Sequence, residues 1–173
     1  MNRRILALCA FVLLLCVQQS LLLHSQTGGQ SDIAFERLTV KQGLSQGSVL
    51  CIVQDRRGFM WFGTEDGLNR WDGHTFKIFR FNPRDTTSLA RNYIEALYED
   101  KEGVLWVGTK GGLSRFNRTS ETFTNFRADG KPQSLSNAYV TSIVDDARGE
   151  YLWVGTYGGG LCKMDKKTGQ FTT

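Results

Sequence analysis

The chain has 173 residues, of which 40% are hydrophobic and 22% are charged, a balance typical of globular proteins. Its formal net charge is +4, which falls to about +2 if Arg3 and Arg4 leave with an N-terminal signal. The remaining basic residues are scattered, so the composition argues against a nucleic-acid partner. Cys9 and Cys16 lie in the same N-terminal segment, so no disulfide framework is predicted for the remainder of the chain.

The first 26 residues are predicted to be a secretory signal peptide. Residues 2–4 are a short basic region, and residues 5–17 are an unbroken run of apolar or small residues. Cleavage is expected near residues 25–27, and residues 27–34 are predicted to be a linker. An uncleaved anchor is the alternative, because residues 5–23 could span a bilayer, although polar residues interrupt the run. A lipid anchor on Cys16 is disfavoured, since Leu15 precedes it instead of a small residue.

One phrase occurs three times in the chain and organises everything after the linker. It centres on Trp61, Trp106 and Trp153, which lie 45 and then 47 residues apart. A period in this range, with several short strands in each unit, indicates a repeat architecture such as a β-propeller. The sequence therefore predicts an all-β chain in which residues 35–173 form about three blades of an incomplete propeller, in units of about 43–86, 87–132 and 133–173.

Each unit is predicted to hold four antiparallel strands joined by turns. Residues 35–39 alternate like a short strand before the first unit, and no stretch after the signal predicts a helix. Asp and Gly at fixed offsets mark the turn between the first and second strands. The predicted strands are residues 49–53, 59–64, 68–71 and 76–81, then 93–98, 104–109, 113–116 and 123–126, then 139–144, 151–156, 161–164 and 170–173.

The repeated phrases also resemble a known family. The patterns Asp-x-x-Gly-x-Leu-Trp-Val-Gly-Thr and Gly-Gly-Leu-Ser-Arg-Phe, with Ser-Leu-Ser-Asn before an inner strand, resemble the two-component regulator propeller repeat over residues 35–173. The resemblance implies the extracytoplasmic sensor of a histidine kinase, often a hybrid kinase, or of a diguanylate cyclase. Such sensors carry seven blades per propeller, so the chain is expected to be a fragment without the membrane span, the kinase core and the phosphorylated His.

The residues that could suggest a catalytic or metal site are better explained by packing and turn formation. The three repeated tryptophans are predicted to pack between neighbouring blades. One carboxylate per turn falls short of the six to eight oxygen ligands that calcium takes, so turn capping is predicted for Asp55, Asp100 and Asp146. With His24 in the signal, His74 alone cannot build a Ser-His-Asp triad or a zinc site with several His ligands. No catalytic residue, cofactor or metal is predicted.

A ligand site is predicted where polar loops converge. Antiparallel order places the turns between first and second strands, and between third and fourth strands, on one face of the propeller, and all other connections on the second face. Propellers bind ligands where loops converge around the channel, and charges, amides and rings suit a polar small molecule or an oligosaccharide. A merely solvated loop rim is the alternative for any single residue. The candidates on the second face are Glu65, Asp66, Arg91, Asn92, Lys110, Asn137, Tyr139 and Tyr157.

These observations lead to one functional expectation and its alternatives. The chain is expected to be the ligand-sensing part of a bacterial two-component protein, exported to the periplasm and attached to the inner membrane through segments outside this chain. Its partners would be the ligand, the remainder of the sensor chain and, in the full-length parent, a second copy. The alternatives are a secreted propeller acting as an enzyme or a protein-interaction scaffold, or the sensor of a diguanylate cyclase.

Overall fold

A computed structural model describes residues 35–172, and the chain divides into two units, Met1–Arg37 and Leu38–Thr173. The predicted signal peptide, its cleavage site and the linker at 27–34 lie outside the described residues. The second unit holds every described strand. In the described residues, no helix is long and apolar enough to cross a bilayer.

The strand predicted over residues 35–39 is wrong, because no strand forms there and a three-residue 3-10 helix follows. Thr39 caps the short 3-10 helix η1 (Val40–Gln42), where its hydroxyl accepts a hydrogen bond from the Lys41 amide at 3.2 Å. The Gln42 side chain in turn accepts from the Thr39 amide at 2.9 Å. This reciprocal capping satisfies amides that no neighbouring strand pairs with, so it outweighs the short apolar alternation.

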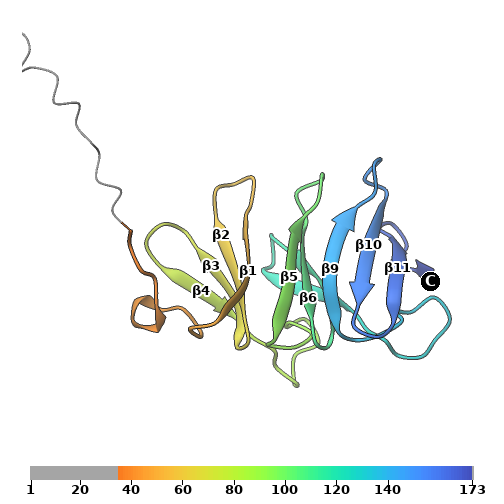
Figure 1. Ribbon diagram of the computed structural model, residues 1–173, viewed down its shortest axis with the longest axis horizontal. Coiled ribbons are helices and arrows are strands. Elements are labelled where there is room, and N and C mark those ends of the chain that lie inside the picture. Colours follow the sequence, from red (N-terminus) through yellow and green to blue (C-terminus); the bar gives the residue numbers. More distant parts are fainter. Residues whose placement is uncertain (1–34, 173) are drawn as a thin grey trace, which may run out of the picture. The chain divides into compact units, whose positions relative to one another are not determined.

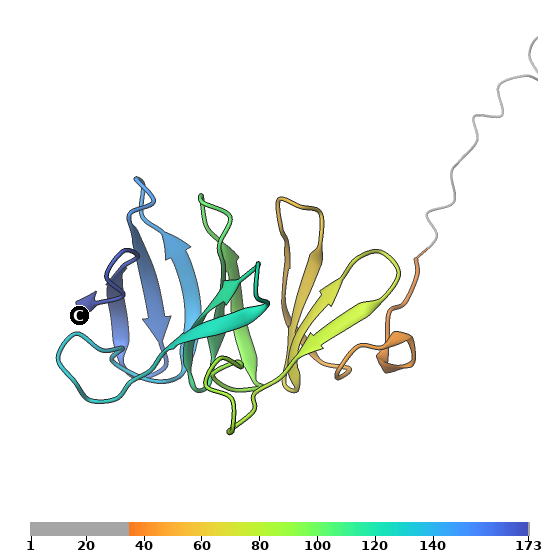
Figure 2. The ribbon, with the colours of Figure 1, turned by 180° about the vertical axis from the view of Figure 1, so that it is seen from behind.

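The rest of the unit confirms the three predicted blades, each a four-stranded antiparallel sheet in sequence order (Figures 1 and 2). β5 and β9 begin one residue later than predicted, and β4 ends two residues earlier, because the amide of Phe81 donates to the side chain of Asn92 instead of a strand. The strands are β1 (Val49–Gln54), β2 (Met60–Thr64), β3 (Gly67–Trp71), β4 (Phe76–Phe79), β5 (Ile94–Glu99), β6 (Leu105–Thr109), β7 (Gly112–Asn117), β8 (Thr122–Phe126), β9 (Val140–Asp145), β10 (Tyr151–Thr156), β11 (Gly160–Asp165) and β12 (Phe171–Thr172).

The hydrophobic core lies between neighbouring blades. One buried cluster joins the first blade to the second through side chains such as Trp61, Leu68 and Leu105, and another joins the second to the third through Trp106 and Met164. Large aromatic and aliphatic side chains give such contacts most of their stabilisation. The first strands β1, β5 and β9 follow one another across these contacts.

The glycines in the first two copies of the repeated phrase, Gly63 and Gly108, lie where the next blade approaches closely. A Cβ atom on Gly63 would lie 2.7 Å from the side chain of Ile94, and one on Gly108 would lie 2.8 Å from that of Val140. Both contacts fall well inside normal carbon–carbon separations, so any larger residue would push the inner strands of adjacent blades apart. The glycine in these two copies of the phrase therefore serves the packing of neighbouring blades, whereas the Asp and Gly residues between the first and second strands form the turns.

The predicted packing role is confirmed for two of the repeated tryptophans. Trp61 is fully buried and Trp106 is 1% exposed, each on the side of its sheet that faces the following blade. Trp153 occupies the same register position but is 37% exposed, because its neighbours Leu152 and Val154 point to the second blade and it points to the other side of the sheet.

The loops separate onto two edges of the blades, as antiparallel order predicts. We call the edge that carries the turns from first to second and from third to fourth strands the turn edge; the β1–β2, β5–β6 and β9–β10 turns lie at the top of Figure 1. We call the opposite edge, which carries the turns from second to third strands and the connections between blades, the rim edge. The candidate ligand residues lie on the rim edge.

Candidate functional site

The eight predicted rim residues fall into two groups with different surroundings. Those of the first group belong to the β2–β3 turn and to the segment that leads into β5, and those of the second group surround the starts of β5 and β9. The first group is Glu65, Asp66, Arg91 and Asn92, and the second is Lys110, Asn137, Tyr139 and Tyr157.

The first group is largely engaged in contacts within the chain. Asp66 forms an ion pair with Arg80 at 2.9 Å and accepts a longer hydrogen bond of 3.3 Å from the Asn92 side chain. The guanidinium of Arg91 lies 4.5 Å from the centre of the Phe81 ring. Among these residues, Glu65 and Arg91 are exposed. Asp66, Arg91 and Asn92 therefore contact one another or residues of the connection between the first two blades.

The second group forms a row of aromatic rings with a lysine against it. The ring of Tyr139 lies 5.4 Å from that of Tyr157 and 6.3 Å from that of Tyr93, measured between centroids. The ammonium of Lys110 lies 3.5 Å from the centre of the Tyr93 ring and 5.1 Å from that of Tyr139. We call Tyr93, Lys110, Tyr139 and Tyr157 the tyrosine row. Tyr93 and Lys110 belong to the second blade, and Tyr139 and Tyr157 belong to the third.

The backbone explains why these side chains meet. Within the second and third blades, the turn after the second strand is tied to the residue just before the first strand: the amide of Lys110 donates to the Tyr93 carbonyl at 3.2 Å, and that of Tyr157 donates to the Tyr139 carbonyl at 2.8 Å. Asn137 shapes the approach to β9, because its side chain accepts from the Tyr139 amide at 2.9 Å. Equivalent positions of successive blades thus align along the rim edge.

Sequence reasoning missed two residues of this site, Tyr93 and Glu95. Tyr93 stands directly before β5 as Tyr139 stands directly before β9, so aligning the second unit with the third would have found it. Glu95 gave no such signal, because the third unit has Thr141 at the equivalent position. Its role appears only in the fold, where its carboxylate accepts a hydrogen bond from the Tyr139 hydroxyl at 3.0 Å.

The charges around the tyrosine row favour a polar ligand. Partial burial and the hydrogen bond to Glu95 raise the pKa of Tyr139 to about 12, so its hydroxyl is a neutral donor at physiological pH. Within residues 35–172, no carboxylate forms an ion pair with Lys110. Tyr157 is 70% exposed. Rings that offer an apolar face and a polar edge, with a cation beside them, can contact a polyhydroxylated molecule on both its apolar and its polar atoms.

The turn edge is built from repeated ionic contacts between blades. Asp55 caps its turn by accepting from the amides of Arg57 and Phe59, as predicted, and it also accepts from the Trp61 indole at 2.8 Å. Arg118 of the second blade reaches back to Asp55 at 2.7 Å and pairs with Glu99 at 2.8 Å. We call this set of contacts the first clasp.

A second clasp repeats this arrangement one blade further on. Asp100 accepts from the amides of Glu102 and Val104 and from the Trp106 indole, and Lys166 bridges it to Asp145, with both Lys166 contacts at 3.2 Å. Asp146 likewise accepts from turn amides, which confirms the capping role predicted for all three aspartates. Among the described residues, no three His, Cys, Asp or Glu side chains form a group able to hold a metal ion.

Burial opposes ionisation of the clasp carboxylates, but their partners outweigh it. Hydrogen bonds from Trp61 and Arg118 hold the pKa of Asp55 below its usual value, and those from Trp106, the Val104 amide and Lys166 do the same for Asp100. Both carboxylates are therefore ionised at neutral pH and fully committed to partners within the chain. The clasps bind neighbouring blades to each other and leave these groups unavailable for a ligand.

The same repeats occur in known proteins. A family model described as the two component regulator propeller matches residues 43–66, 88–111 and 134–158, one segment in each blade. The chain is 51% identical over 71 residues to Histidine kinase P4 of Formosa agariphila, an alignment that covers 41% of this chain and 5% of the kinase.

A solved structure matches the fold over most of the chain. The crystallised extracellular domain of a proposed hybrid two-component system from B. thetaiotaomicron aligns with a TM-score of 0.74 and 37% identity, over 80% of this chain and 20% of that domain. The chain thus spans only a small part of the relatives that it matches. With one repeat match in every blade and the same blade architecture in this relative, the three blades are two-component regulator propeller repeats.

Proposed function

We propose that this chain is part of the extracytoplasmic sensor domain of a two-component histidine kinase, and that it binds a polar ligand such as an oligosaccharide at the tyrosine row. The similarity to an extracellular domain of a hybrid two-component system supports the sensor assignment. The tyrosine row carries the ligand assignment, because three rings and a lysine without a carboxylate partner in the described residues lie together on the rim edge. The chain would act without catalysis and pass the signal to parts outside it.

The proposal separates residues that bind from residues that hold the fold. The side chains of Asp66 and Asn92 already form hydrogen bonds or ion pairs within the chain. These two residues would therefore position the connection between blades and not touch the ligand. Lys110, Tyr139 and Tyr157 of the predicted set, with Tyr93 added, would contact it directly. Glu95 would orient the Tyr139 hydroxyl, because its carboxylate accepts a hydrogen bond from that hydroxyl.

Calorimetric titration of the parent protein with a panel of neutral and acidic oligosaccharides tests this function. Lys110→Ala should abolish or strongly weaken binding of the ligand that the unmodified protein takes. Lys163→Ala is a matched control, because Lys163 lies 3.7 Å from the centre of the Tyr151 ring in a similar pair away from the tyrosine row. Equal affinities for both variants would place the site elsewhere, and a parent that binds only proteins would favour the scaffold alternative.

The signalling part of the proposal needs its own measurement. Autophosphorylation of the full-length parent should change when the bound oligosaccharide is added, and the change should disappear in the Lys110→Ala parent. Binding without any change in phosphorylation would support a carbohydrate-binding propeller that is not a sensor.

A further inference from the structure

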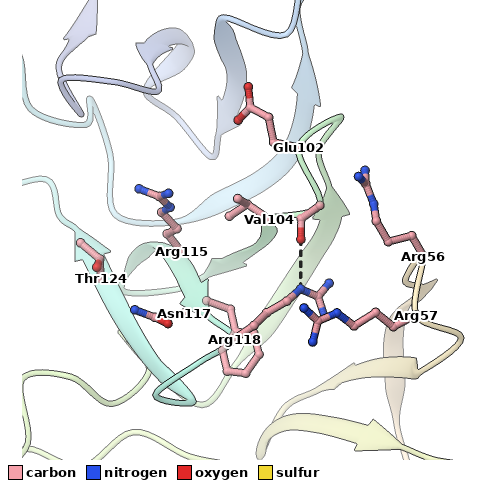
Figure 3. A pocket seen from close by; sticks show the side chains of 10 residues that line it. Arg56, Arg57, Glu102, Val104, Arg115, Asn117, Arg118 and Thr124 are labelled. Atoms are coloured by element: carbon pink, nitrogen blue, oxygen red, sulfur yellow. Dashed lines mark hydrogen bonds between the residues drawn. The ribbon is translucent and has the colours of Figure 1, made fainter.

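A cavity of about 440 Å³ opens on the turn edge between the first and second blades (Figure 3). Its volume is within the range of small-molecule sites. Arginines from two blades surround it: the β1–β2 turn supplies two and the end of β7 the others. The residues that matter to the argument are Arg56, Arg57, Arg115, Arg118, Glu102 and Asn117.

Two of these arginines are already committed to the first clasp. Arg118 pairs with Asp55 and Glu99 and donates through Nε to the Gly103 carbonyl at 3.0 Å, the bond drawn in Figure 3. Arg56 donates to the Asp100 carbonyl at 2.7 Å and lies 3.6 Å from Glu99. Their charges are therefore offset by carboxylates within the chain.

The other two arginines are not offset in this way. In the part of the chain that the structure describes, neither Arg57 nor Arg115 forms an ion pair with a carboxylate. The Arg115 guanidinium lies near the Trp106 ring, with its central carbon 5.9 Å from the ring centre. Both side chains are exposed, and both line the cavity. They leave positive charge at its mouth.

The equivalent groove between the second and third blades provides a comparison within the same molecule. It has a volume of about 580 Å³, and Arg115 and Glu102 border it as well. At the position that Arg57 holds two residues after its turn aspartate, the second blade has Glu102, which pairs with Lys166 at 3.2 Å. Glu150 adds a second carboxylate there. Arg148 of the third blade also forms no ion pair among the described residues, but the second groove has two lining carboxylates, Glu102 and Glu150, where the first has Glu102 alone. The first groove therefore has the larger excess of arginines over carboxylates.

We infer that the cavity between the first and second blades binds the anionic group of a small ligand, a carboxylate, sulfate or phosphate, through Arg57 and Arg115. The guanidinium fork matches such groups because it donates two parallel hydrogen bonds to two oxygens. Asn117 lines the same cavity and offers an amide to neighbouring hydroxyls of the ligand. This site lies on the opposite edge from the tyrosine row and does not depend on the proposed function.

Titration of the full chain with glucuronate, glucose 6-phosphate and glucose at low ionic strength tests the inference. The two acidic probes should bind at one site and glucose should not, which separates the anionic group from the sugar ring, while inorganic phosphate and sulfate show whether the anion alone suffices. The double variant Arg57→Gln and Arg115→Gln should lose about tenfold or more in affinity for the acidic probes, the loss expected when a charge-assisted hydrogen bond is removed. Its thermal melt should be unchanged, since both side chains are exposed.

Two further variants make the result decisive. Arg148→Gln removes an equal charge from the neighbouring groove and should leave affinity within twofold, whereas Glu102→Gln should tighten binding by removing the carboxylate that borders both grooves. The inference is overturned if glucose binds as well as glucuronate, if the double variant binds normally, or if Arg148→Gln weakens binding as much as the double variant does. The last outcome would show general surface attraction instead of a site.

Discussion

The two edges of the blades use similar side chains for different purposes. On the turn edge, Arg118 and Lys166 are 15% and 6% exposed and bridge carboxylates of adjacent blades. On the rim edge, Lys110 is exposed and lies against aromatic rings without a carboxylate partner among the described residues. The comparison shows that burial and partners, and not residue type, separate a structural cation from one that is free to meet a ligand.

The largest expected effect tests the packing of the repeated tryptophans next to the clasps. Trp106→Ala removes a buried ring and the indole donor to Asp100, so we expect a loss of about 3 to 5 kcal/mol in the free energy of unfolding. Trp153→Ala is the control, since the same repeat position is partly exposed in this chain, and it should cost roughly 1 kcal/mol. Denaturant unfolding measures both, and equal losses would contradict the packing role.

The next effect tests the clasp itself. Arg118→Ala leaves Asp55 without its cation and Glu99 with only the longer contact to Arg56, and because Asp55 and Arg118 are 0% and 15% exposed we expect a loss of about 2 to 3 kcal/mol. Arg80→Ala breaks an ion pair in which both side chains are nearly half exposed, and it should cost less than about 1 kcal/mol. A smaller loss for Arg118 than for Arg80 would show that the clasps do not join the blades.

Acidification tests the same contacts with a smaller effect, because a protonated carboxyl still accepts hydrogen bonds. Asp55 and Asp100 have native pKa values below the ordinary 3.8, so their contribution is complete above about pH 4 and is lost as the pH falls through the native values. The free energy of unfolding should therefore decrease between pH 5 and strongly acidic pH. With Asp55→Asn and Asp100→Asn together, this decrease should be smaller, and an unchanged pH dependence would refute the assignment.

The smallest effect on stability belongs to the rim edge. Tyr157→Ala should change the free energy of unfolding by no more than about 0.5 kcal/mol, because the ring is 70% exposed. The same change should cost about 1 to 3 kcal/mol of affinity for an oligosaccharide that stacks on the tyrosine row. Thermal melts and titrations on one preparation give both values, and a large loss of stability with normal affinity would reverse the roles of the two edges.

The sequence could predict the blades because each strand and turn is specified locally. Alternating apolar residues and the Asp and Gly of each turn recur in every unit, and eleven of the twelve predicted strands agree with the structure to within one residue at both ends. Residues 35–39 were predicted wrongly, because the capping contacts between Thr39 and Gln42 depend on side chains that alternation ignores. The candidate site was predicted in part, since loop order places residues on an edge without showing which are already paired.

The sequence by itself therefore determined the repeat, the blade architecture, the edge on which each loop lies and the capping role of the turn aspartates. Only the tertiary structure decided that Arg118 and Lys166 reach back to the preceding blade, that Asp66 is paired, and that Tyr93 and Glu95 join Tyr139. The physical reason is distance: strands and turns form from neighbours in the chain, whereas a charge becomes structural or available only when residues of another blade approach it.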